Sequence, residues 1–333
     1  MQRFTFILFC ISCVLLLAVG LVCLQSQFNG VYWIPSSSTL RRKGNDLLSP
    51  SSNHHPNVTV LDRIYNPPTE IPIGAFVLEE YKLIFVTIPK VACTEWKRMF
   101  MRMTENPHWC NEDINVHYPE INHVPYLSQY SIEEATAMMI SPEWTKAVFV
   151  REPKERVLSA FLDKAVYEKS FFKTKCCRNL KDDHAKQDCI RDMTSFPSFL
   201  HYVTNYPTEC WNPHWEAQTS KIDSKWWPYF NFIGYHHNLQ QDAKRLLSQL
   251  ISSRDGMNAW DKLGSTGWGE GDGCENRSGA FLQTNTATHQ QKSGEKMKQY
   301  YEAETETLVE KYWEKDWTQA ELQFPPVKLY TTF

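Results

Sequence analysis

The stretch that decides the fold is residues 83–98, LIFVTIPKVACTEWKR. Its first part, residues 83–88, is a short apolar and β-branched run, which is typical of a buried strand. The residues from Trp96 to Met103 have helical character, so we expect the chain to turn from a strand into a helix between the two. Such a turn favours anions, because the N–H groups of the first helical turn and the helix dipole both attract negative charge.

Two side chains in this turn support an anion site. Lys90 supplies a mobile cation, and Thr94 supplies a hydroxyl donor. An ordinary strand–turn–helix with a stray lysine would look the same locally, since short motifs have real false-positive rates. The two interpretations stand about even on this segment alone, so a second segment has to separate them.

Residues 147–161, AVFVREPKERVLSAF, form that second segment. An apolar strand again runs into a helix, and Pro153 suits the first helical turn because its missing N–H costs nothing there. Arg151 lies at the end of the strand, while Arg156 and Ser159 are three residues apart and share a helix face. A guanidinium fork and a hydroxyl are suited to phosphate. Two such sites in order on one chain argue against a surface helix with solvated charges.

Together the two segments resemble the donor-binding motifs of Golgi carbohydrate sulfotransferases. Residues 89–98 resemble the 5′-phosphosulfate loop of that family, and residues 150–161 resemble its 3′-phosphate site. The resemblance is closest to the branch that contains the chondroitin and dermatan 4-O-sulfotransferases. It covers roughly residues 75 to 320, with weaker matches in order at residues 127–132 (LSQYSI), 213–215 (PHW), 232–235 (FIGY) and 300–316.

The resemblance implies a reaction and a set of site residues. The donor would be 3′-phosphoadenosine 5′-phosphosulfate (PAPS), and the sulfuryl group would pass to a glycan hydroxyl by in-line displacement. Lys90 would be catalytic, because an ammonium stabilises charge that develops on the leaving phosphate. Lysine and arginine would neutralise the anion, so no metal is expected. The residues assigned to donor binding are Pro89, Lys90, Val91, Ala92, Cys93, Thr94, Glu95, Arg151, Arg156 and Ser159.

The acceptor hydroxyl needs a general base. The resemblance points to His123, which lies between the two donor motifs. His214, in the PHW match, is the alternative catalytic residue and would otherwise orient the acceptor. His117 and Glu216 are weaker candidates for the base.

The N-terminus predicts a membrane anchor. Residues 4–24 are almost entirely apolar and carry no charge. A span of about 20 residues can cross a bilayer, whereas the apolar part of a cleaved signal peptide, the alternative, is roughly 7–15 residues long. We therefore expect a type II protein with residues 1–3 as a cytoplasmic tail, 4–24 as a transmembrane signal anchor, 25–73 as a luminal stem and 74–333 as a luminal sulfotransferase domain.

Other features agree with the Golgi lumen. Asn57 and Asn276 lie in N-glycosylation sequons, which are used only if the domain is luminal. Cys93 is expected to be unpaired because it lies inside the donor loop. A zinc site at residues 176–189 is disfavoured, because the paired C-x-x-C spacing is missing. The cysteines that remain for three disulfides, with connectivities left open, are Cys110, Cys176, Cys177, Cys189, Cys210 and Cys274.

Alternating strands and helices predict an α/β fold with a central parallel sheet flanked by helices. The resemblance implies the P-loop-like sulfotransferase fold. Two apolar stripes predict core-facing helices; one holds Leu239, Ala243, Leu246, Leu247 and Leu250, and the other, with one gap, holds Met297, Tyr300, Tyr301, Leu308 and Tyr312. The net charge of −3 gives no field that points to nucleic acid, and the oligomeric state stays open.

Three alternatives remain. A phosphate-binding kinase would need a G-x-x-x-x-G-K-[ST] loop, and this loop has no glycine. A catalytically silent glycan-binding or scaffolding relative is disfavoured because Lys90 and Arg151 are both present. A sulfotransferase with a non-glycan acceptor stays open. Family members often have a cysteine pair where residues 225–228 read KWWP here, so the glycan specificity of the family is not carried over.

Overall fold

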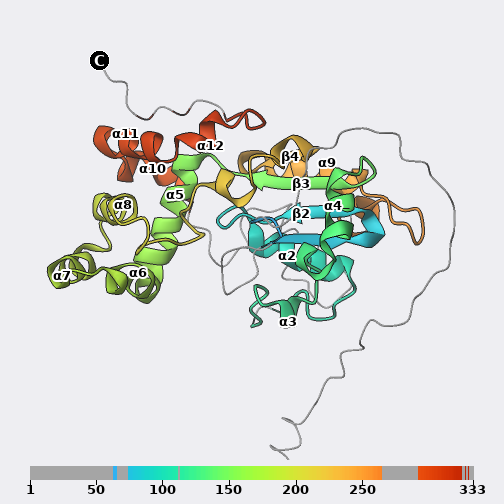
Figure 1. Cartoon of the computed structure of the whole chain (residues 1–333), viewed down its shortest axis with the longest axis horizontal. Coiled ribbons are helices and arrows are strands. Elements are labelled where there is room, and N and C mark those ends of the chain that lie inside the picture. The colour runs from blue at the N-terminus through green and yellow to red at the C-terminus, as the bar shows by residue number, and fades with distance from the viewer. Residues whose placement is uncertain are drawn as a thin grey trace, which may run out of the picture. The chain divides into compact units, whose positions relative to one another are not determined.

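The computed structural model describes residues 63–65, 74–111, 113–264, 292–324, 327 and 329 (Figure 1). All of them belong to a unit that spans Pro56–Phe333. The expected anchor at residues 4–24 and the sequons at Asn57 and Asn276 lie outside the described residues, and these assignments stay predictions. No helix in the described ranges is long and apolar enough to cross a membrane.

The described strands are β1 (Ala75–Leu78), β2 (Leu83–Val86), β3 (Thr145–Val150) and β4 (Phe232–Tyr235). The α-helices are α2 (Cys93–Met103), α3 (Pro119–Asn122), α4 (Ile132–Ile140), α5 (Pro153–Phe161), α6 (Lys169–Lys175), α7 (Asp183–Asp192), α8 (Phe196–Asn205), α9 (Leu239–Gln249), α10 (Ser293–Tyr300), α11 (Ala303–Tyr312) and α12 (Glu314–Thr318). The π-helical turns are η3 (Leu162–Tyr167) and η8 (Trp260–Gly264). The 3₁₀ turns are η1 (Glu79–Tyr81), η2 (Leu127–Gln129), η4 (Cys177–Asn179), η5 (Gln218–Lys221), η6 (Trp227–Tyr229) and η7 (His236–Asn238).

The sheet has the strand order β1-β2-β3-β4. Strands β2, β3 and β4 are parallel, which confirms the expected arrangement around the two motifs. Strand β1 pairs antiparallel with β2, with Phe76 opposite Phe85, so the sheet is mixed and the prediction of a purely parallel sheet is wrong at this edge. The short turn η1, followed by Lys82 at φ 46°, is too short for a crossover and returns the chain antiparallel.

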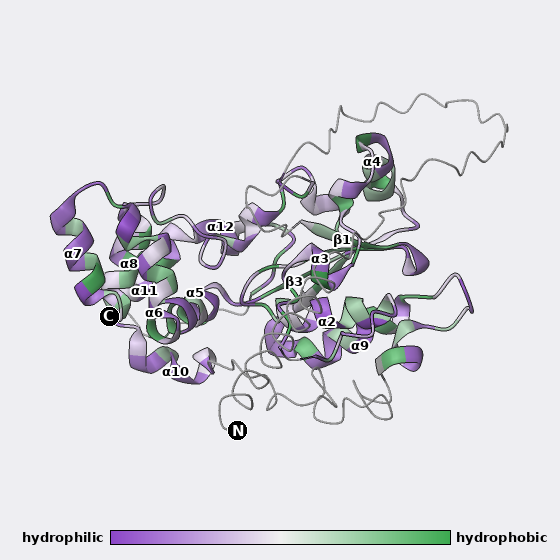
Figure 2. Ribbon diagram, turned by 90° about the horizontal axis from the view of Figure 1, so that it is seen from below, coloured by the Kyte–Doolittle hydropathy of each residue, from purple (hydrophilic) through white to green (hydrophobic). Residues whose placement is uncertain are grey.

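Helix α2 forms one side of the core around the sheet. Its apolar residues recur at intervals of three and four, as an amphipathic helix requires. Trp96 packs against Phe85 and Phe149, with ring centroids 4.8 and 4.6 Å apart. All residues of β1 and β2 are buried, and Figure 2 colours much of β1 and β3 as hydrophobic. Helix α9 packs on β4 and buries Ala243, as its apolar stripe predicts.

The helices that follow β3 build a second hydrophobic cluster. Helix α5 leads from β3 into this group, where α6, α7 and α8 gather with α10 and α11 (Figures 1 and 2). Phe161 of α5 packs on Phe199 of α8, with ring centroids 5.4 Å apart. The second predicted stripe does not form one helix, because Tyr301 is extended (φ −83°, ψ 142°) between α10 and α11; Tyr312 at its end is 41% exposed.

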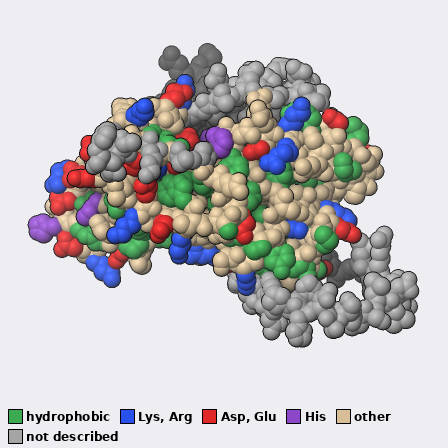
Figure 3. Space-filling view, turned by 90° about the horizontal axis from the view of Figure 1, so that it is seen from above, with side chains coloured by type: hydrophobic (Ala, Val, Ile, Leu, Met, Phe, Trp, Pro, Cys, Tyr) green, Lys and Arg blue, Asp and Glu red, His purple; other side chains and the backbone are tan. Residues whose placement is uncertain are grey.

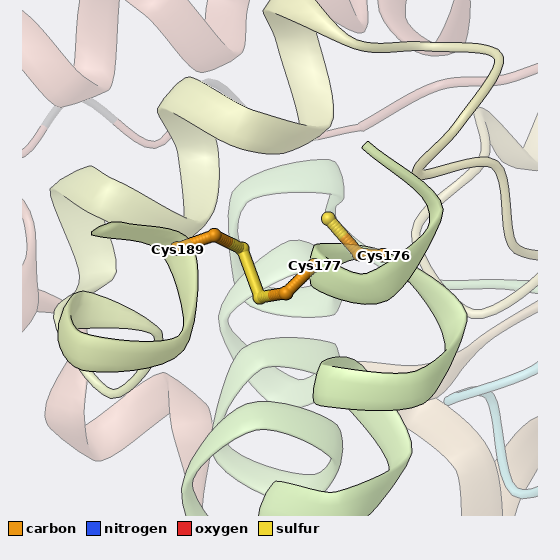
Figure 4. A group of neighbouring side chains, drawn as sticks. All are labelled: Cys176, Cys177 and Cys189. Carbon is orange, nitrogen blue, oxygen red and sulfur yellow. A yellow bond between two sulfur atoms is a disulfide. The ribbon is translucent and has the colours of Figure 1, made fainter. Parts of the chain in front are cut away.

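Two disulfides cross-link this helical part. They join Cys176 to Cys210 and Cys177 to Cys189, while Cys93 is free as expected. Figure 4 shows the sulfurs of the vicinal cysteines and Cys189 close together, and they lie within 4.8 Å of one another. Because these sulfurs are bonded in disulfides, they offer no thiolate to a zinc ion. Cys110 is also disulfide-bonded.

Residues 63–65, which we expected in the stem, contact the folded domain. Ile64 is 1% exposed and belongs to the core around the sheet, and its carbonyl accepts from the Ala75 amide at 3.4 Å. The Arg63 guanidinium pairs with Glu216. The stem boundary at residue 73 stays a prediction, but the chain makes tertiary contacts before it.

Charged side chains of both signs share the surface. Figure 3 shows lysine and arginine interspersed with aspartate and glutamate on the face that it draws. The whole chain carries a net charge of −3. Electrostatic attraction by this protein is therefore a local property of its sites rather than of the molecule as a whole.

The close approach of β4 to β3 gives a test of the sheet register. Gly234 lies opposite Phe149, and a Cβ at Gly234 would overlap the buried Phe149 ring. We expect Gly234→Ala to lower the free energy of unfolding by about 1–3 kcal/mol, because the ring has no room to move. Urea denaturation measures this loss. In a Phe149→Leu background the same substitution should cost less, and an equal cost in both backgrounds would contradict the packing.

Candidate functional site

The carboxyl ends of the three parallel strands meet at one edge of the sheet. The loop 87–92 follows β2, Arg151 follows β3, and His236 follows β4. In the register of the sheet Val150 lies beside Tyr235, so Arg151 and His236 are the next residues on neighbouring strands. Ligands of open α/β sheets bind at this edge, outside the carboxyl ends of the strands.

The loop after β2 is shaped for an anion without any glycine. Lys90 and Ala92 both have left-handed backbone conformations, at φ 69° and 54°. Such residues cost on the order of 1–3 kcal/mol each and collect at ligand sites. Ala92 is the N-cap of α2, and no side chain caps that end. The dipole of α2 at this uncapped N-terminus favours negative charge, so the loop is compatible with an anion.

Arginines of the second motif clamp this loop. Arg151 donates from Nη1 to the Lys90 carbonyl at 3.0 Å, and Arg156 donates from Nε to the Pro89 carbonyl at 3.0 Å. Arg156 also donates to the carbonyls of Glu216 and Pro213, at 2.7 and 3.2 Å. Its side chain is fully buried, which lowers its pKa to about 10 and leaves it charged. Arg156 thus joins the loop after β2 to the His214 loop through backbone oxygens rather than facing an open anion site.

The guanidinium of Arg151 has both partnered and unpartnered hydrogen-bonding groups. Its Nη2 donates to Glu155 Oε1 at 2.6 Å and to Ser293 Oγ at 2.7 Å, whereas its buried Nε has no partner in the described part of the chain. Ser159 is buried on the same helix as Glu155. A cavity of about 400 Å³ lies beside these groups; its lining includes Glu152, Glu155, His237, Gly294, Glu295 and Lys298. The second motif therefore borders a space that can hold a ligand.

The Lys90 ammonium is held by an acid that we did not predict. Its Nζ pairs with Asp163 Oδ2 at 3.0 Å, and Lys164 pairs with the same oxygen at 3.1 Å. Burial lowers the pKa of Lys90, and Asp163 opposes that effect. Burial by itself would raise the pKa of Asp163, but the two lysines leave that pKa below its usual value. Asp163 is four residues beyond Ser159, so the i,i+4 spacing was a signal that it shares this face.

His214 is oriented as a proton acceptor. Its backbone N–H donates to Asn212 Oδ1 at 3.1 Å, which identifies that atom as the amide oxygen. The Nδ1 of the ring lies 2.6 Å from the same oxygen and must carry the hydrogen, so Nε2 of the neutral ring keeps its lone pair. Burial, and then Lys164 and Lys90, hold the pKa of His214 well below its usual value. The ring is therefore neutral and packs edge-on against Phe171 at 5.3 Å.

His117 has the opposite tautomer. Its Nδ1 lies 2.9 Å from Lys97 Nζ, which can donate to it, so we assign the ring hydrogen to Nε2, which faces Thr94 Oγ1 at 3.4 Å. Burial, and then Lys97 and Lys164, lower its pKa to about 3. His117 is therefore suited to orient Thr94 and not to accept a proton at Nε2.

His123 lies apart from these contacts. It is exposed and ends α3 in a left-handed conformation (φ 52°), with its backbone N–H bonded to Pro119. Its ring makes no hydrogen bond or ion pair with the rest of the described chain. The assignment of the base to His123 stays a prediction, with no contact to Lys90 or Thr94 to support it.

Glu216 is occupied by two cations. It pairs with Arg63 through one oxygen and with Lys221 through the other. Burial raises the pKa of Glu216, but these ion pairs outweigh it and leave the pKa below its usual value. A carboxylate held in this way is a poor proton acceptor, so the weaker candidacy of Glu216 finds no support.

The C-terminal match at residues 300–316 supports the site from behind. Asp316 is fully buried and accepts from the amides of Gln218 and Thr219, at 3.1 and 2.9 Å. Gln218 in turn exchanges hydrogen bonds with the backbone of Arg151, at 3.1 and 2.6 Å. The match therefore fixes the backbone from which Arg151 projects. No local signal predicted Ser293, because it lies 142 residues from Arg151.

Comparisons with known proteins find one matching family and several related proteins. The model of a family described as "Sulfotransferase family" matches residues 74–316. Carbohydrate sulfotransferase 11 of Rattus norvegicus is 31% identical over 181 residues, which cover 51% of this chain and 50% of the relative. Carbohydrate sulfotransferase 14 of Mus musculus is 25% identical over 191 residues, 54% of this chain and 49% of the relative.

A third relative, carbohydrate sulfotransferase 9 of Homo sapiens, is 25% identical over 188 residues, which cover 54% of this chain and 41% of the relative. The chain spans about half the length of the curated relatives that it matches, or somewhat less. No solved structure matches significantly.

The neutral state of His117 predicts a pH dependence of stability. The folded ring has a pKa of about 3, whereas an unfolded histidine titrates near pH 6.5, so the unfolded chain takes up an extra proton as the pH falls. Stability is therefore lost on acidification from about pH 6.5 towards 3. Between pH 6.5 and 4.5, we expect His117→Gln to lose on the order of 1–2 kcal/mol less than wild type in urea denaturation. Parallel losses in the two proteins would contradict a neutral His117.

Proposed function

Because this chain belongs to the sulfotransferase family, we propose that it transfers a sulfuryl group from PAPS to a hydroxyl of a glycan acceptor. The observation that carries the proposal is the clamped loop after β2. Lys90 lies in a left-handed turn at a helix N-terminus, and Arg151 of the second motif holds its carbonyl at 3.0 Å. One strand-to-helix turn thus supplies the cation and the backbone amides, and the next supplies the arginine.

The residues present fit such a donor. The loop after β2 and the uncapped N-terminus of α2 suit a 5′-phosphosulfate, with Thr94 as a hydroxyl donor. The unpartnered Nε of Arg151 suits the additional 3′-phosphate, and Ser159 of the same motif adds a hydroxyl. The cavity beside Glu155 and Gly294 leaves room for the rest of the nucleotide.

The mechanism follows from these positions. The donor supplies an activated sulfuryl group on a phosphate leaving group. Lys90 stabilises charge on the leaving oxygens, and the loop amides fix the group in line with the acceptor. Arg151 and Ser159 hold the 3′ end, while Arg156 keeps the loop in place through the Pro89 carbonyl. These residues position and stabilise charge and form no covalent bond to substrate.

We assign the general base to His214, which the sequence offered as the alternative to His123. Its Nε2 is the free acceptor of a neutral ring that Asn212 orients. Burial chiefly lowers its pKa, and the positive charges of Lys164 and Lys90 lower it further. An anionic donor beside these lysines would raise that pKa towards the useful range. The expectation for His123 rests on the resemblance alone.

The acceptor class comes from the relatives, which are named carbohydrate sulfotransferases. We propose a glycan for this chain also, without a named sugar or hydroxyl. A non-glycan acceptor and a catalytically silent glycan-binding role remain the alternatives. The silent role is disfavoured because Lys90, Arg151 and His214 are all present.

The compartment is part of the same proposal. The disulfides of the helical part agree with an oxidising lumen. We propose a Golgi membrane protein of type II topology, anchored by residues 4–24 and glycosylated at Asn57 or Asn276. A P-loop-like sulfotransferase fold is consistent with the parallel strands β2 to β4 and the loop that follows β2.

Transfer of labelled sulfate from PAPS to a panel of desulfated glycans tests the function. We expect Lys90→Ala to lower turnover by about two orders of magnitude or more with little change in the affinity for adenosine 3′,5′-bisphosphate, because Lys90 acts on transition-state charge. Arg151→Ala should chiefly weaken that affinity, measured by calorimetry. Arg191→Ala, which removes an exposed arginine of α7, is the matched control. Wild-type protein that neither binds the nucleotide nor transfers sulfate would refute the proposal.

The base assignment has its own test. We expect His214→Gln to reduce turnover at saturating acceptor by about 10²-fold or more while nucleotide affinity is kept, because proton transfer by a positioned group contributes about 10²–10⁴-fold. His123→Gln should stay near wild type. Asn212→Leu should lower turnover as well, since it leaves the tautomer of His214 unfixed. An inactive His123→Gln beside an active His214→Gln would return the base to His123.

A further inference from the structure

Lys90 lies in surroundings that work against its charge. Its side chain is 14% exposed, and burial is the main effect that lowers its pKa. A desolvated lysine readily loses its proton. Deprotonated Lys90 could not neutralise a leaving phosphate, so the site needs a group of opposite charge that keeps this lysine protonated.

The π-helical turn η3 supplies such a group, the carboxylate of Asp163. It continues α5 directly, and the Glu168 amide bonds the Asp163 carbonyl at 2.7 Å, which is the i→i+5 pattern of a π turn. Asp163 is 5% exposed and directs Oδ2 at Lys90. The wider turn brings Lys164, the next residue, to the same oxygen. Turns of this kind occur mostly as single insertions inside α-helices and are frequent at functional sites.

A second acid, Glu168, pairs with Lys164, so the Asp163 carboxylate remains as the counter-charge of Lys90. Lys164 donates to both carboxylate oxygens of Glu168, at 2.9 Å each, and lies 5.0 Å from the centre of the Phe171 ring. With Glu168 neutralising Lys164, the carboxylate of Asp163 is the main counter-charge of the donor-loop lysine. Among the described residues, Asp163 is the only acid that forms an ion pair with Lys90.

We propose that Asp163 is a positioning residue that keeps Lys90 protonated and directs its ammonium towards the bound donor. The proposal deepens the proposed function and rests on it. Asp163 offsets the desolvation of Lys90 in the absence of donor, so that the ammonium is already in place when the anion arrives. It does so without contacting the donor loop backbone, which the two arginines hold.

Several other groups face Lys90, and the test must separate their effects. Those that act on Lys90, or on which Lys90 acts, are Asp163 and Lys164 of η3, Cys93 of α2, His117 before α3, His214 before η5 and His236 of η7. The three histidines have lowered pKa values and are neutral near pH 7. Asp163 is therefore the acid whose removal changes the charge around Lys90 while Lys164 and Cys93 stay as they are.

The direct test is trace acetylation of lysines in the full chain with acetic anhydride at several pH values, read by mass spectrometry. Only the neutral amine reacts, so the rate at Lys90 reports its protonation. In Asp163→Asn, we expect acetylation of Lys90 near pH 8 to be about tenfold or more faster than in wild type, since an opposite charge at this distance shifts a pKa by roughly 1–3 units. Lys82, an exposed lysine paired with Glu143, should react equally in both proteins.

Enzymatic activity gives a second readout. The alkaline limb of kcat/KM should move to lower pH in Asp163→Asn, because Lys90 loses its proton earlier, and Asp163→Glu should restore it in part. Glu143→Gln removes the acid of the Lys82 pair and is the matched control, with an unchanged profile. A merely structural role of Asp163 would lower activity equally at all pH values, and that result would overturn the proposal.

Folding failure of Asp163→Asn would not leave the question open. Lys97 of the wild-type protein is 1% exposed, burial lowers its pKa, and no carboxylate among the described residues pairs with it. The proposal requires Lys90 to become reactive at a higher pH than Lys97 in the wild-type protein. The reverse order would overturn it. Since labelling needs no donor, unchanged Lys90 reactivity with intact sulfate transfer would refute this inference alone, whereas absent transfer would refute the proposed function.

Discussion

Hydrogen bonds from two arginine guanidinium groups to backbone carbonyls hold this site together. The loop after β2 and the second motif follow different strands, and in the described part of the chain Arg151 and Arg156 tie them together through hydrogen bonds to the carbonyls of Lys90 and Pro89. Arg156 has no access to water, so its charge must be satisfied by these oxygens. The same guanidinium reaches the carbonyls of Pro213 and Glu216 on either side of His214, so one buried charge links that loop to the loop after β2.

These hydrogen bonds explain how the loop tolerates its left-handed backbone conformation. Left-handed Lys90 and Ala92 carry strain that glycine would avoid, yet glycine would also leave the loop free to collapse. Hydrogen bonds from Arg151 and Arg156 to the Lys90 and Pro89 carbonyls help to hold that conformation. A loop that is fixed in this way needs little rearrangement to bind an anion, which is the condition for electrostatic catalysis.

The charges of the site act on its histidines as much as on a ligand. Burial keeps the rings of His117 and His214 neutral, and the charges of Lys90 and Lys164 add to that effect at both. Neutral rings have distinct nitrogens, and their partners decide which one accepts. Asn212 leaves Nε2 of His214 as an acceptor, whereas Lys97 takes Nδ1 of His117 and makes it a donor towards Thr94. Two similar residues therefore receive opposite roles from single neighbours.

The sequence by itself determined β2, α2, β3 and α5, because apolar periodicity, Pro153 and the strand-to-helix turns are local properties of the chain. It also singled out Lys90 and Arg151, since their chemistry shows in the motif. Strand β1, the break at Tyr301 and the partners Ser293, Asp163 and Asn212 were missed, as was the buried role of Arg156. Only the tertiary structure decided these, because hydrogen-bond partners, desolvation and the tautomer of His214 depend on distances between atoms that the chain brings together only when it is folded.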